Sequence, residues 1–377
     1  MAKLGEYASF IMGQAPASSD CNTDGVGTPF VKAGQFGKSV PIIDEWTTNP
    51  LKMASSEDVL ICVVGATSGK LNRGVDCAIG RSVAAIRPNR EAIRDYIYYG
   101  LHPWIQRLRG GSQGSAIGVI TKDMLDVVEM PFPDVKRQKE IVQILSSIEC
   151  IIKKREVELG KLDELIKARF VELFGTLDNP SQEYEKATLK ELCNKITDGK
   201  HGGCDQEEGT DRYFVGAREI FDDEVHYETA PQINIEEFEK DYKRCNVEIG
   251  DFLIVNTGAT IGKSAIASDI RTEHTLLQKS VALLKVKREV LNPVFLKWCY
   301  RVNTKMYLVE SASAQPNLLL SKINSTVIYV PDISLQKQFA DFVEQVDKSK
   351  VVVQKALDEA QLLFDSLMQE YFGEKGD

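Results

Sequence analysis

The chain has 377 residues, of which 43% are apolar and 27% charged, and its formal net charge is −9. This length fits two or three domains, and the composition excludes a disordered chain. No run of about 18 apolar residues and no basic-then-apolar leader occurs, so we expect a cytoplasmic protein without a membrane span or secretory signal. The acidic balance argues against a nucleic-acid binder that acts alone.

The first globular domain is expected over residues 1–135. Within it, residues 58–64 have the apolar run of a buried strand that ends at a glycine turn, and residues 82–86 read as another strand. Residues 90–100 read as a helix. Strands and helices are interspersed with many turns, which favours an α+β domain with mixed secondary structure over a doubly wound sheet.

A long helix is predicted for residues 136–175 because apolar side chains recur there at alternating steps of four and three. Pro133 precedes it and Gly175 follows it, as is usual at helix starts and ends. The seam residues are Ile141, Leu145, Ile148, Ile152, Leu159, Leu162, Ile166 and Leu173.

The polar, turn-rich residues 176–182 are predicted to be a linker to a second domain over 183–332. This domain repeats the pattern of the first, with strands expected at 252–255 and 280–284 and a helix at 293–302. A second long helix follows over 333–377. Its seam residues are Phe339, Val343, Val346, Val353, Leu357, Phe364 and Leu367.

Each long helix spans about 35 residues and therefore roughly 50 Å. Its apolar seam needs a partner, and the other helix is the obvious one, since the period is nearer 3.5 than 3.6 residues. An internal two-fold repeat makes the pair an antiparallel coiled coil, with Arg155, Arg169 and Lys350 as polar seam positions that set the register. The alternative is that each helix packs only on its own domain.

The two halves of the chain repeat the same short sequence motifs, or words, in the same order. V-V-G-A-T-S-G-K at 63–70 corresponds to N-T-G-A-T-I-G-K at 256–263. P-D-V-x-x-Q-K at 133–139 corresponds to P-D-I-x-x-Q-K at 331–337, and both helices end on Phe-Gly. Little is shared between these words, so we interpret them as a common scaffold that carries variable surfaces.

Motifs for chemistry are missing from the sequence. The G-x-x-x-G-K turn is one residue too short for a Walker A phosphate loop, which makes an NTPase a weak alternative. We interpret it as a turn that presents amides and a lysine to a phosphate. The eight cysteines and four histidines form no C-x-x-C or H-E-x-x-H pair, and no amino-methyltransferase tetrapeptide occurs. We therefore expect no catalytic residues and no metal site.

This duplicated organisation resembles the specificity subunit of Type I restriction-modification enzymes, over essentially the full chain. The first half departs from the family pattern, since it lacks the Q-P-N of residues 315–317. The resemblance implies a non-catalytic subunit without a cofactor of its own. Each globular domain would read one half of a bipartite double-stranded DNA target. The helices would set the spacer and dock two methyltransferase subunits that hold S-adenosylmethionine. Restriction and translocase subunits that use ATP and magnesium would join them.

Reading DNA needs side chains at base edges and cations at phosphates. The candidates lie near predicted loops, and for each of them the alternative is an ordinary solvated residue. They are Lys70, Arg73, Arg81, Arg107, Arg109 and Gln113 in the first domain, and Lys200, His201, Arg218, Lys263, Lys279, Gln315 and Asn317 in the second.

Two other functions remain open at this point. A similar specificity chain could serve a Type II-like system with a fused nuclease-methyltransferase. A coiled-coil adaptor without a DNA role is the other alternative, and the two large divergent domains on a matched scaffold argue against it.

Overall fold

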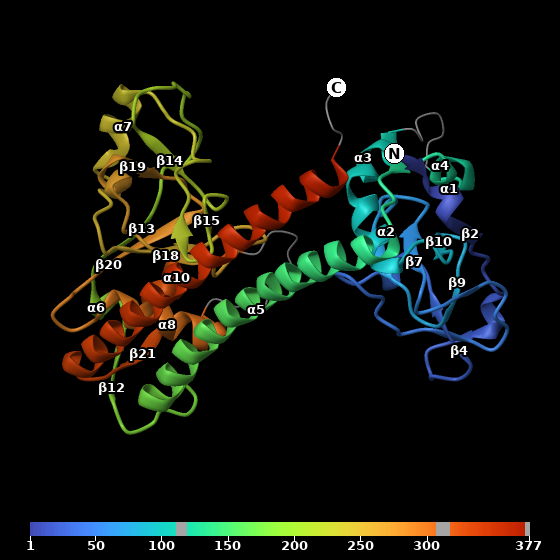
Figure 1. Ribbon diagram of the computed structural model, residues 1–377. Coiled ribbons are helices and arrows are strands. Elements are labelled where there is room, and N and C mark those ends of the chain that lie inside the picture. Colours follow the sequence, from blue (N-terminus) through green and yellow to red (C-terminus); the bar gives the residue numbers. More distant parts are fainter. Residues whose placement is uncertain (111–118, 307–316, 374–377) are drawn as a thin grey trace. The chain divides into compact units, whose positions relative to one another are not determined.

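The computed structural model describes residues 1–110, 119–306 and 317–373. The chain forms two compact units. Unit 1 comprises Met1–Glu156 with Gln354–Asp377, and unit 2 comprises Val157–Val353. Each unit thus contains one globular domain and a segment of both long helices, α5 (Val135–Phe174) and α10 (Ile333–Phe372) (Figure 1). Each helix has 40 residues, which corresponds to about 60 Å.

The globular part of unit 1 is built from short strands and helices. Its strands are β1 (Ala2–Lys3), β2 (Ala8–Met12), β3 (Cys21–Asn22), β4 (Thr28–Val31), β5 (Trp46–Thr47), β6 (Met53–Ala54), β7 (Val59–Cys62), β8 (Leu71–Arg73), β9 (Cys77–Ile79), β10 (Val83–Pro88) and β11 (Glu129–Met130). Its helices are α1 (Leu4–Tyr7), α2 (Arg94–Leu101), α3 (Ile105–Gly110) and α4 (Lys122–Asp126), with 3₁₀ turns at Ser18–Asp20, Ala33–Gln35 and His102–Trp104.

Two larger sheets make up most of this domain, and β1 and β11 pair separately in a third, two-stranded sheet. One has four antiparallel strands in the order β2-β10-β7-β8, and the other has five strands in the order β3-β5-β4-β9-β6. Alternation along β10 separates two cores: Ala84 and Ile86 face the core that includes α2, whereas Val83 and Ala85 face the core beneath β4 and β9.

Unit 2 repeats this plan. Its strands are β12 (Glu185–Thr188), β13 (Cys193–Asp198), β14 (Tyr213–Val215), β15 (Ile220–Phe221), β16 (Glu224–Val225), β17 (Phe252–Val255), β18 (Ser264–Ile266), β19 (Thr275–Leu277), β20 (Val281–Val286) and β21 (Val327–Val330). Its helices are α6 (Leu189–Leu192), α7 (Ile235–Tyr242), α8 (Pro293–Val302) and α9 (Leu320–Ser325), with 3₁₀ turns at Ile270–His274 and Thr304–Met306.

The sheet order β13-β20-β17-β18 in unit 2 matches β2-β10-β7-β8 in unit 1. Likewise, β14 pairs with β19 in parallel, as β4 pairs with β9. The sequence repeat is therefore a repeat of topology, and the predicted α+β class with an internal repeat is confirmed. The predicted domain boundaries stay predictions, because each compact unit also holds helix segments from both halves.

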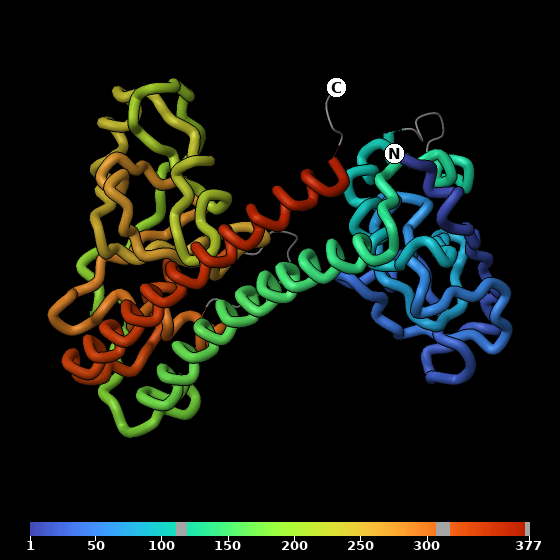
Figure 2. The backbone as a smooth tube through the Cα atoms, viewed as in Figure 1, coloured from blue at the N-terminus to red at the C-terminus, as the bar shows by residue number. Residues whose placement is uncertain are grey.

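The long helices run in opposite directions within each unit. In unit 1, Ile141 and Leu145 near the start of α5 share a core with Met368 and Phe372 at the end of α10. The red end of α10 accordingly lies beside the cyan helix α2 (Figure 2). In unit 2, the end of α5 shares a core with the start of α10, where Phe339 is fully buried. The antiparallel prediction is confirmed, and each helix end also packs on a globular domain.

The predicted seam differs from the buried face at the helix ends. Along α5 full burial continues from Ile166 to Phe170 and Phe174, whereas Leu173 is only half-buried. Along α10 the buried face likewise includes Met368 and Phe372, whereas the predicted seam residue Leu367 is only half-buried. These steps of four fit a straight helix packed on a domain, and they replace the coiled-coil step of three.

The polar seam residue Lys350 makes an ion pair between the helices of unit 2. Its Nζ lies 2.6 Å from Asp163 Oδ1 of α5. Arg169, another polar seam residue, places its guanidinium 6.0 Å from the ring of Phe342 on α10. Both contacts use the polar positions that interrupt the apolar seam.

The repeated P-D-x-x-x-Q-K words contain a matched pair of buried glutamines. Gln138 of α5 accepts from the Ile93 amide at 3.2 Å, and its side-chain amide donates to the carbonyls of Glu91 and Pro133, both at 2.8 Å. These contacts explain why α2 begins at Arg94 rather than at residue 90: the preceding backbone is already bonded to the long helix.

Gln336 of α10 does the same in unit 2. It accepts from the Asn292 amide at 2.8 Å and donates to the carbonyls of Val290 and Pro331 at 3.0 and 2.8 Å. Both glutamine residues are 0% exposed. This repeated word therefore ties each long helix to the entry of the helix that follows the central strand of its domain.

Candidate nucleic-acid interface

The repeated G-A-T-x-G-K word is a hairpin turn at the end of the central sheet. In unit 1 it joins β7 to β8, where the Gly69 amide donates to the Cys62 carbonyl at 2.8 Å. In unit 2 it joins β17 to β18, where the Gly262 amide donates to the Val255 carbonyl at 3.0 Å. Gly69 and Gly262 have φ values of +83° and +91°, a conformation that favours glycine.

Backbone amides in these turns are used internally. The Lys70 amide donates to the Thr67 carbonyl at 3.0 Å, and the Lys263 amide donates to the Thr260 carbonyl at 3.1 Å. These two amides therefore do not point toward a phosphate. What the turns offer to a ligand is their lysine side chains.

The two lysine side chains differ in their surroundings. Lys70 donates from Nζ to the Phe36 carbonyl at 2.7 Å and so holds the neighbouring loop. Lys263 is exposed, and its ammonium has no hydrogen bond or ion pair within the described part of the chain. Of the two, Lys263 is the better placed for a phosphate contact.

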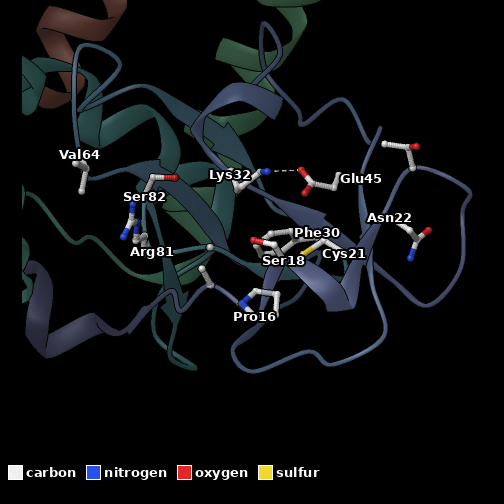
Figure 3. A pocket seen from close by; sticks show the side chains of 13 residues that line it. Pro16, Ser18, Cys21, Asn22, Phe30, Lys32, Glu45, Val64, Arg81 and Ser82 are labelled. Carbon is white, nitrogen blue, oxygen red and sulfur yellow. Dashed lines mark ion pairs between the residues drawn. The ribbon is translucent and has the colours of Figure 1, made fainter.

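Cations of α3 and the strand ends lie around the turn of unit 1. Arg109 donates from Nε to the Ser68 carbonyl at 2.5 Å, which places α3 against the turn. Arg107 stacks at 5.0 Å over the ring of Trp104. Arg81 is exposed at the turn before β10 and lines a cavity (Figure 3).

Arg73 lies in a partly buried ionic network rather than at this edge. Its guanidinium is bonded to Asp95 at 2.8 Å and to Glu149 of α5 at 2.7 Å, and it stacks 4.2 Å from the ring of Tyr98. Burial opposes ionisation of both carboxyls, but hydrogen bonds outweigh it, from Arg94 and Arg73 to Asp95 and from Arg73 and Tyr99 to Glu149. The pKa values of Asp95 and Glu149 therefore lie below their ordinary values. This geometry gives Arg73 a structural role.

The unit 2 candidates also divide into paired and exposed side chains. Lys200 is only 17% exposed and is paired with Asp241 at 2.8 Å. His201 lies 3.2 Å from Asp198. Arg218 and Lys279 are exposed, and within the described residues neither makes a side-chain hydrogen bond or ion pair.

Three candidates belong to the segment that precedes α9 in unit 2 or to its counterpart in unit 1. Asn317 accepts a hydrogen bond from the Thr257 hydroxyl at 3.4 Å and so lies beside the G-A-T-I-G-K turn. Gln113 and Gln315 fall outside the described residues. The DNA-binding assignment of all thirteen residues stays a prediction.

A pair of serines shows that the strand-end edges of the two units are equivalent. Ser82 Oγ accepts from the Ala33 amide at 3.0 Å, and Ser280 Oγ accepts from the Ala217 amide at 3.1 Å. The residues just before them are Arg81 and Lys279. A cation therefore occupies the same scaffold position in both units.

The cavity at this edge of unit 1 has a volume of about 1010 Å³ and is open to solvent. Arg81 and Val64 lie on one side, Asn22 lies on the other, and Phe30 lies between them (Figure 3). Its lining also includes the Lys32–Glu45 ion pair.

Lys32, Glu45 and Asn22 were not among the sequence candidates. The sequence does contain a signal for Lys32. F-V-K-A at 30–33 corresponds to F-V-G-A at 214–217, so this one position differs between two otherwise matching segments. Among the described residues, no group of three or more histidine, cysteine or acidic side chains could hold a metal ion. No described helix has the length and apolar character needed to cross a membrane.

Comparison with known proteins gives consistent results. The family model for the Type I restriction modification DNA specificity domain matches residues 1–161 and 181–360. The putative type I restriction enzyme MjaX specificity subunit of Methanocaldococcus jannaschii is 34% identical over 170 residues, which cover 44% of this chain and 38% of the relative. The MjaVIII specificity subunit of the same organism is 22% identical over 394 residues, covering 94% of this chain and 89% of the relative.

Solved structures share the fold. The S subunit of a Type I restriction-modification system from M. genitalium has a TM-score of 0.61 at 16% identity and covers 100% of this chain and 96% of its own. A chain from a structure that describes complex assembly of the type I R-M system has a TM-score of 0.60 at 16% identity, covering 98% and 96%.

Proposed function

Because the chain belongs to the family of Type I restriction-modification DNA specificity domains, we propose that it is the DNA-reading subunit of a Type I restriction-modification complex. Each unit reads one half of a bipartite double-stranded target. The chain performs no chemistry itself. It acts in the cytoplasm, where such a complex meets chromosomal DNA.

The observation that supports this function best is the repeat of one scaffold with two different surfaces. Both units use the same sheet order, the same hairpin turn and the same serine contact. At the strand-end edge, however, the side chains differ between the units. A scaffold that holds two different surfaces suits an asymmetric target whose halves have different sequences.

Partner subunits supply the chemistry in this proposal. Two methyltransferase subunits hold S-adenosylmethionine, and restriction and translocase subunits use ATP and magnesium. The helices offer a docking surface, since apolar side chains on their outer faces are exposed, such as Ile151 (46%), Val351 (69%) and Leu362 (72%). Exposed apolar groups of this kind are typical of protein interfaces.

Co-expression of the full chain with methyltransferase subunits tests this function. Methylated adenines are mapped across the genome of a host that otherwise lacks adenine methylation. We expect methylation in a split sequence motif with an unread spacer, which is lost when this chain is left out. Methylation without a sequence motif, or a motif that persists without the chain, would contradict the proposal.

A further inference from the structure

In the cavity lining of unit 1, a lysine faces a glycine. Lys32 follows Val31, the last residue of β4, and Gly80 follows Ile79, the last residue of β9. Val31 and Ile79 are partners in the parallel pairing of these strands. Lys32 and Gly80 are therefore neighbours just beyond the strand ends.

Unit 2 has the same backbone arrangement with the side chains exchanged. Gly216 follows Val215 of β14, and Gln278 follows Leu277 of β19, and these strands are again a parallel pair. The long side chain now comes from the second strand, and the glycine lies on the first.

Contacts show that the two long side chains occupy corresponding space. A Cβ atom on Gly80 would lie 3.0 Å from Lys32 Cγ, and a Cβ atom on Gly216 would lie 2.4 Å from Gln278 Oε1. Each unit thus has room for one long polar side chain here, and glycine opposite makes that room. Unit 1 fills the space with lysine, and unit 2 fills it with glutamine.

The scaffold does not need the ion pair that Lys32 makes. Glu45 accepts from the Phe30 amide through its carbonyl at 2.8 Å, and in unit 2 Pro231 takes this backbone role for the Phe214 amide at 2.9 Å. The lysine and glutamate side chains are 43% and 19% exposed. An ion pair this exposed stabilises a fold little, so fold stability does not explain the pair.

We propose that the long polar side chain just beyond this parallel strand pair reads DNA bases. In unit 1 it is Lys32, together with Glu45, and in unit 2 it is Gln278. The inference rests on the proposed function and adds to it the residues and the kind of base pair they read. No catalytic or metal chemistry is involved. Recognition follows from hydrogen-bond donors and acceptors at base edges.

The chemistry of these side chains selects different base pairs. In the major groove, guanine offers the O6 and N7 acceptors while its partner cytosine offers the N4 donor. The Lys32 ammonium and Glu45 carboxylate match that pattern as donor and acceptor. Within the described residues, the Gln278 side-chain amide makes no hydrogen bond, so it is available for the N6 donor and N7 acceptor of adenine.

Neighbouring cations fit the same assignment. Arg81 follows Gly80 and Lys279 follows Gln278, and both are exposed. A cation one residue from a base-reading side chain is well placed for the adjacent phosphate. Position 81 or 279 then supplies affinity, while position 32 or 278 supplies sequence preference.

The test uses the full chain in its methyltransferase complex and maps the methylated motif base by base. In the double variant Lys32→Ala/Glu45→Ala, we expect preference at one G·C position in one half of the motif to fall about tenfold or more. In Gln278→Ala, we expect a similar loss at one A·T position in the other half. Arg81→Ala should lower methylation overall and leave the motif unchanged.

Lys3→Ala is the control, because Lys3 is an exposed lysine of unit 1 that does not line the cavity; its motif should equal that of the wild type. If the alanine pair fails to fold, Lys32→Met/Glu45→Gln keeps the side-chain volumes. Folded variants with an unchanged motif overturn this inference while the proposed function stands. A wild-type complex without any split motif overturns the proposed function instead.

Discussion

At the scale of single residues, cations with similar sequence surroundings have different tasks. Lys70 and Lys263 end the same repeated turn, and both are exposed. The Lys70 ammonium donates to a carbonyl, whereas the Lys263 ammonium makes no hydrogen bond or ion pair with the described residues. Arg73 lies three residues beyond Lys70 and bridges two carboxylates on two helices. Sequence alone marks such residues as equal candidates, and only their contacts separate structural cations from those that can bind phosphate.

Replacing Arg73 tests its structural role. Arg73→Met leaves the partly buried Glu149 without its cation and Asp95 with Arg94 alone, and we expect the free energy of unfolding of unit 1 to fall by about 2–3 kcal/mol, less than for a fully buried pair because Glu149 is partly exposed. Hydrogen-exchange mass spectrometry on peptides of unit 1 measures the loss. Arg90→Met, which changes an exposed arginine, is the control and should shift exchange little. Equal protection in both variants would contradict the assignment.

The same network predicts a pH dependence. Because the pKa values of Asp95 and Glu149 are lowered in the folded state from 3.8 and 4.5, their stabilisation is complete above these ordinary values and is lost as the pH falls through the lowered ones. Urea unfolding of the wild type between pH 6 and about 3 should show this loss. Arg73→Met should show a flatter acid dependence, and identical slopes would count against the network.

Replacing the two turn lysines separates phosphate binding from loop support. Lys263→Ala should weaken DNA binding by the complex for every sequence and reduce the salt slope of log K by about one. Lys70→Ala should change the salt slope less, since its ammonium is bonded to the Phe36 carbonyl. Titrations at several salt concentrations measure both slopes. An unchanged slope in Lys263→Ala would exclude a phosphate contact.

Among the helices and strands, the sequence predicted those that show a clear periodicity of apolar residues. The strands around 58–64, 82–86 and 252–255, the helix at 293–302 and both long helices are present. Deviations occur where tertiary contacts compete with local pattern. Phe170 and Phe174 are buried because the end of α5 packs on a globular domain, which a heptad pattern does not encode.

The candidate site was less predictable than the fold. Lysines and arginines are easy to find near predicted loops, but Lys32 lies just after β4, a strand that was not predicted. Its relation to Gly80 arises from a parallel strand pair formed by residues far apart in the chain. Such pairings follow from the fold and not from local sequence.

The buried glutamines permit a matched test in both halves. Gln138→Ala and Gln336→Ala each leave backbone groups of the adjoining helix entry without partners, so each should lower the free energy of unfolding of its own unit by about 1–3 kcal/mol. Hydrogen exchange should report the loss in unit 1 for the first variant and in unit 2 for the second. The control Gln143→Ala alters an exposed side chain of α5 and should have little effect. Loss of protection spread equally over both units would contradict local anchoring.

At the scale of the whole molecule, the net charge of −9 agrees with a subunit that reads DNA within a complex. Acidic side chains outnumber basic ones, 55 to 46. Partners can supply most phosphate contacts, while this chain supplies the base preference. The isolated chain should therefore bind DNA weakly and lose binding as salt rises.

Each long helix contributes one segment to each unit. In the proposed function the helices set the spacing of the half-sites. Inserting four residues into both helices, after Glu156 and after Val353, adds about 6 Å at 1.5 Å per residue while the segments within each unit keep their partners. At about 3.4 Å per base pair, the unread spacer of the methylated motif should lengthen by about two base pairs, with both half-sites unchanged. An insertion into α5 alone should instead impair the complex, since it shifts one helix against the other. Methylome sequencing measures the spacer and the extent of methylation in both variants. An unchanged spacer in the folded double insertion would show that the helices do not set the distance between the half-sites.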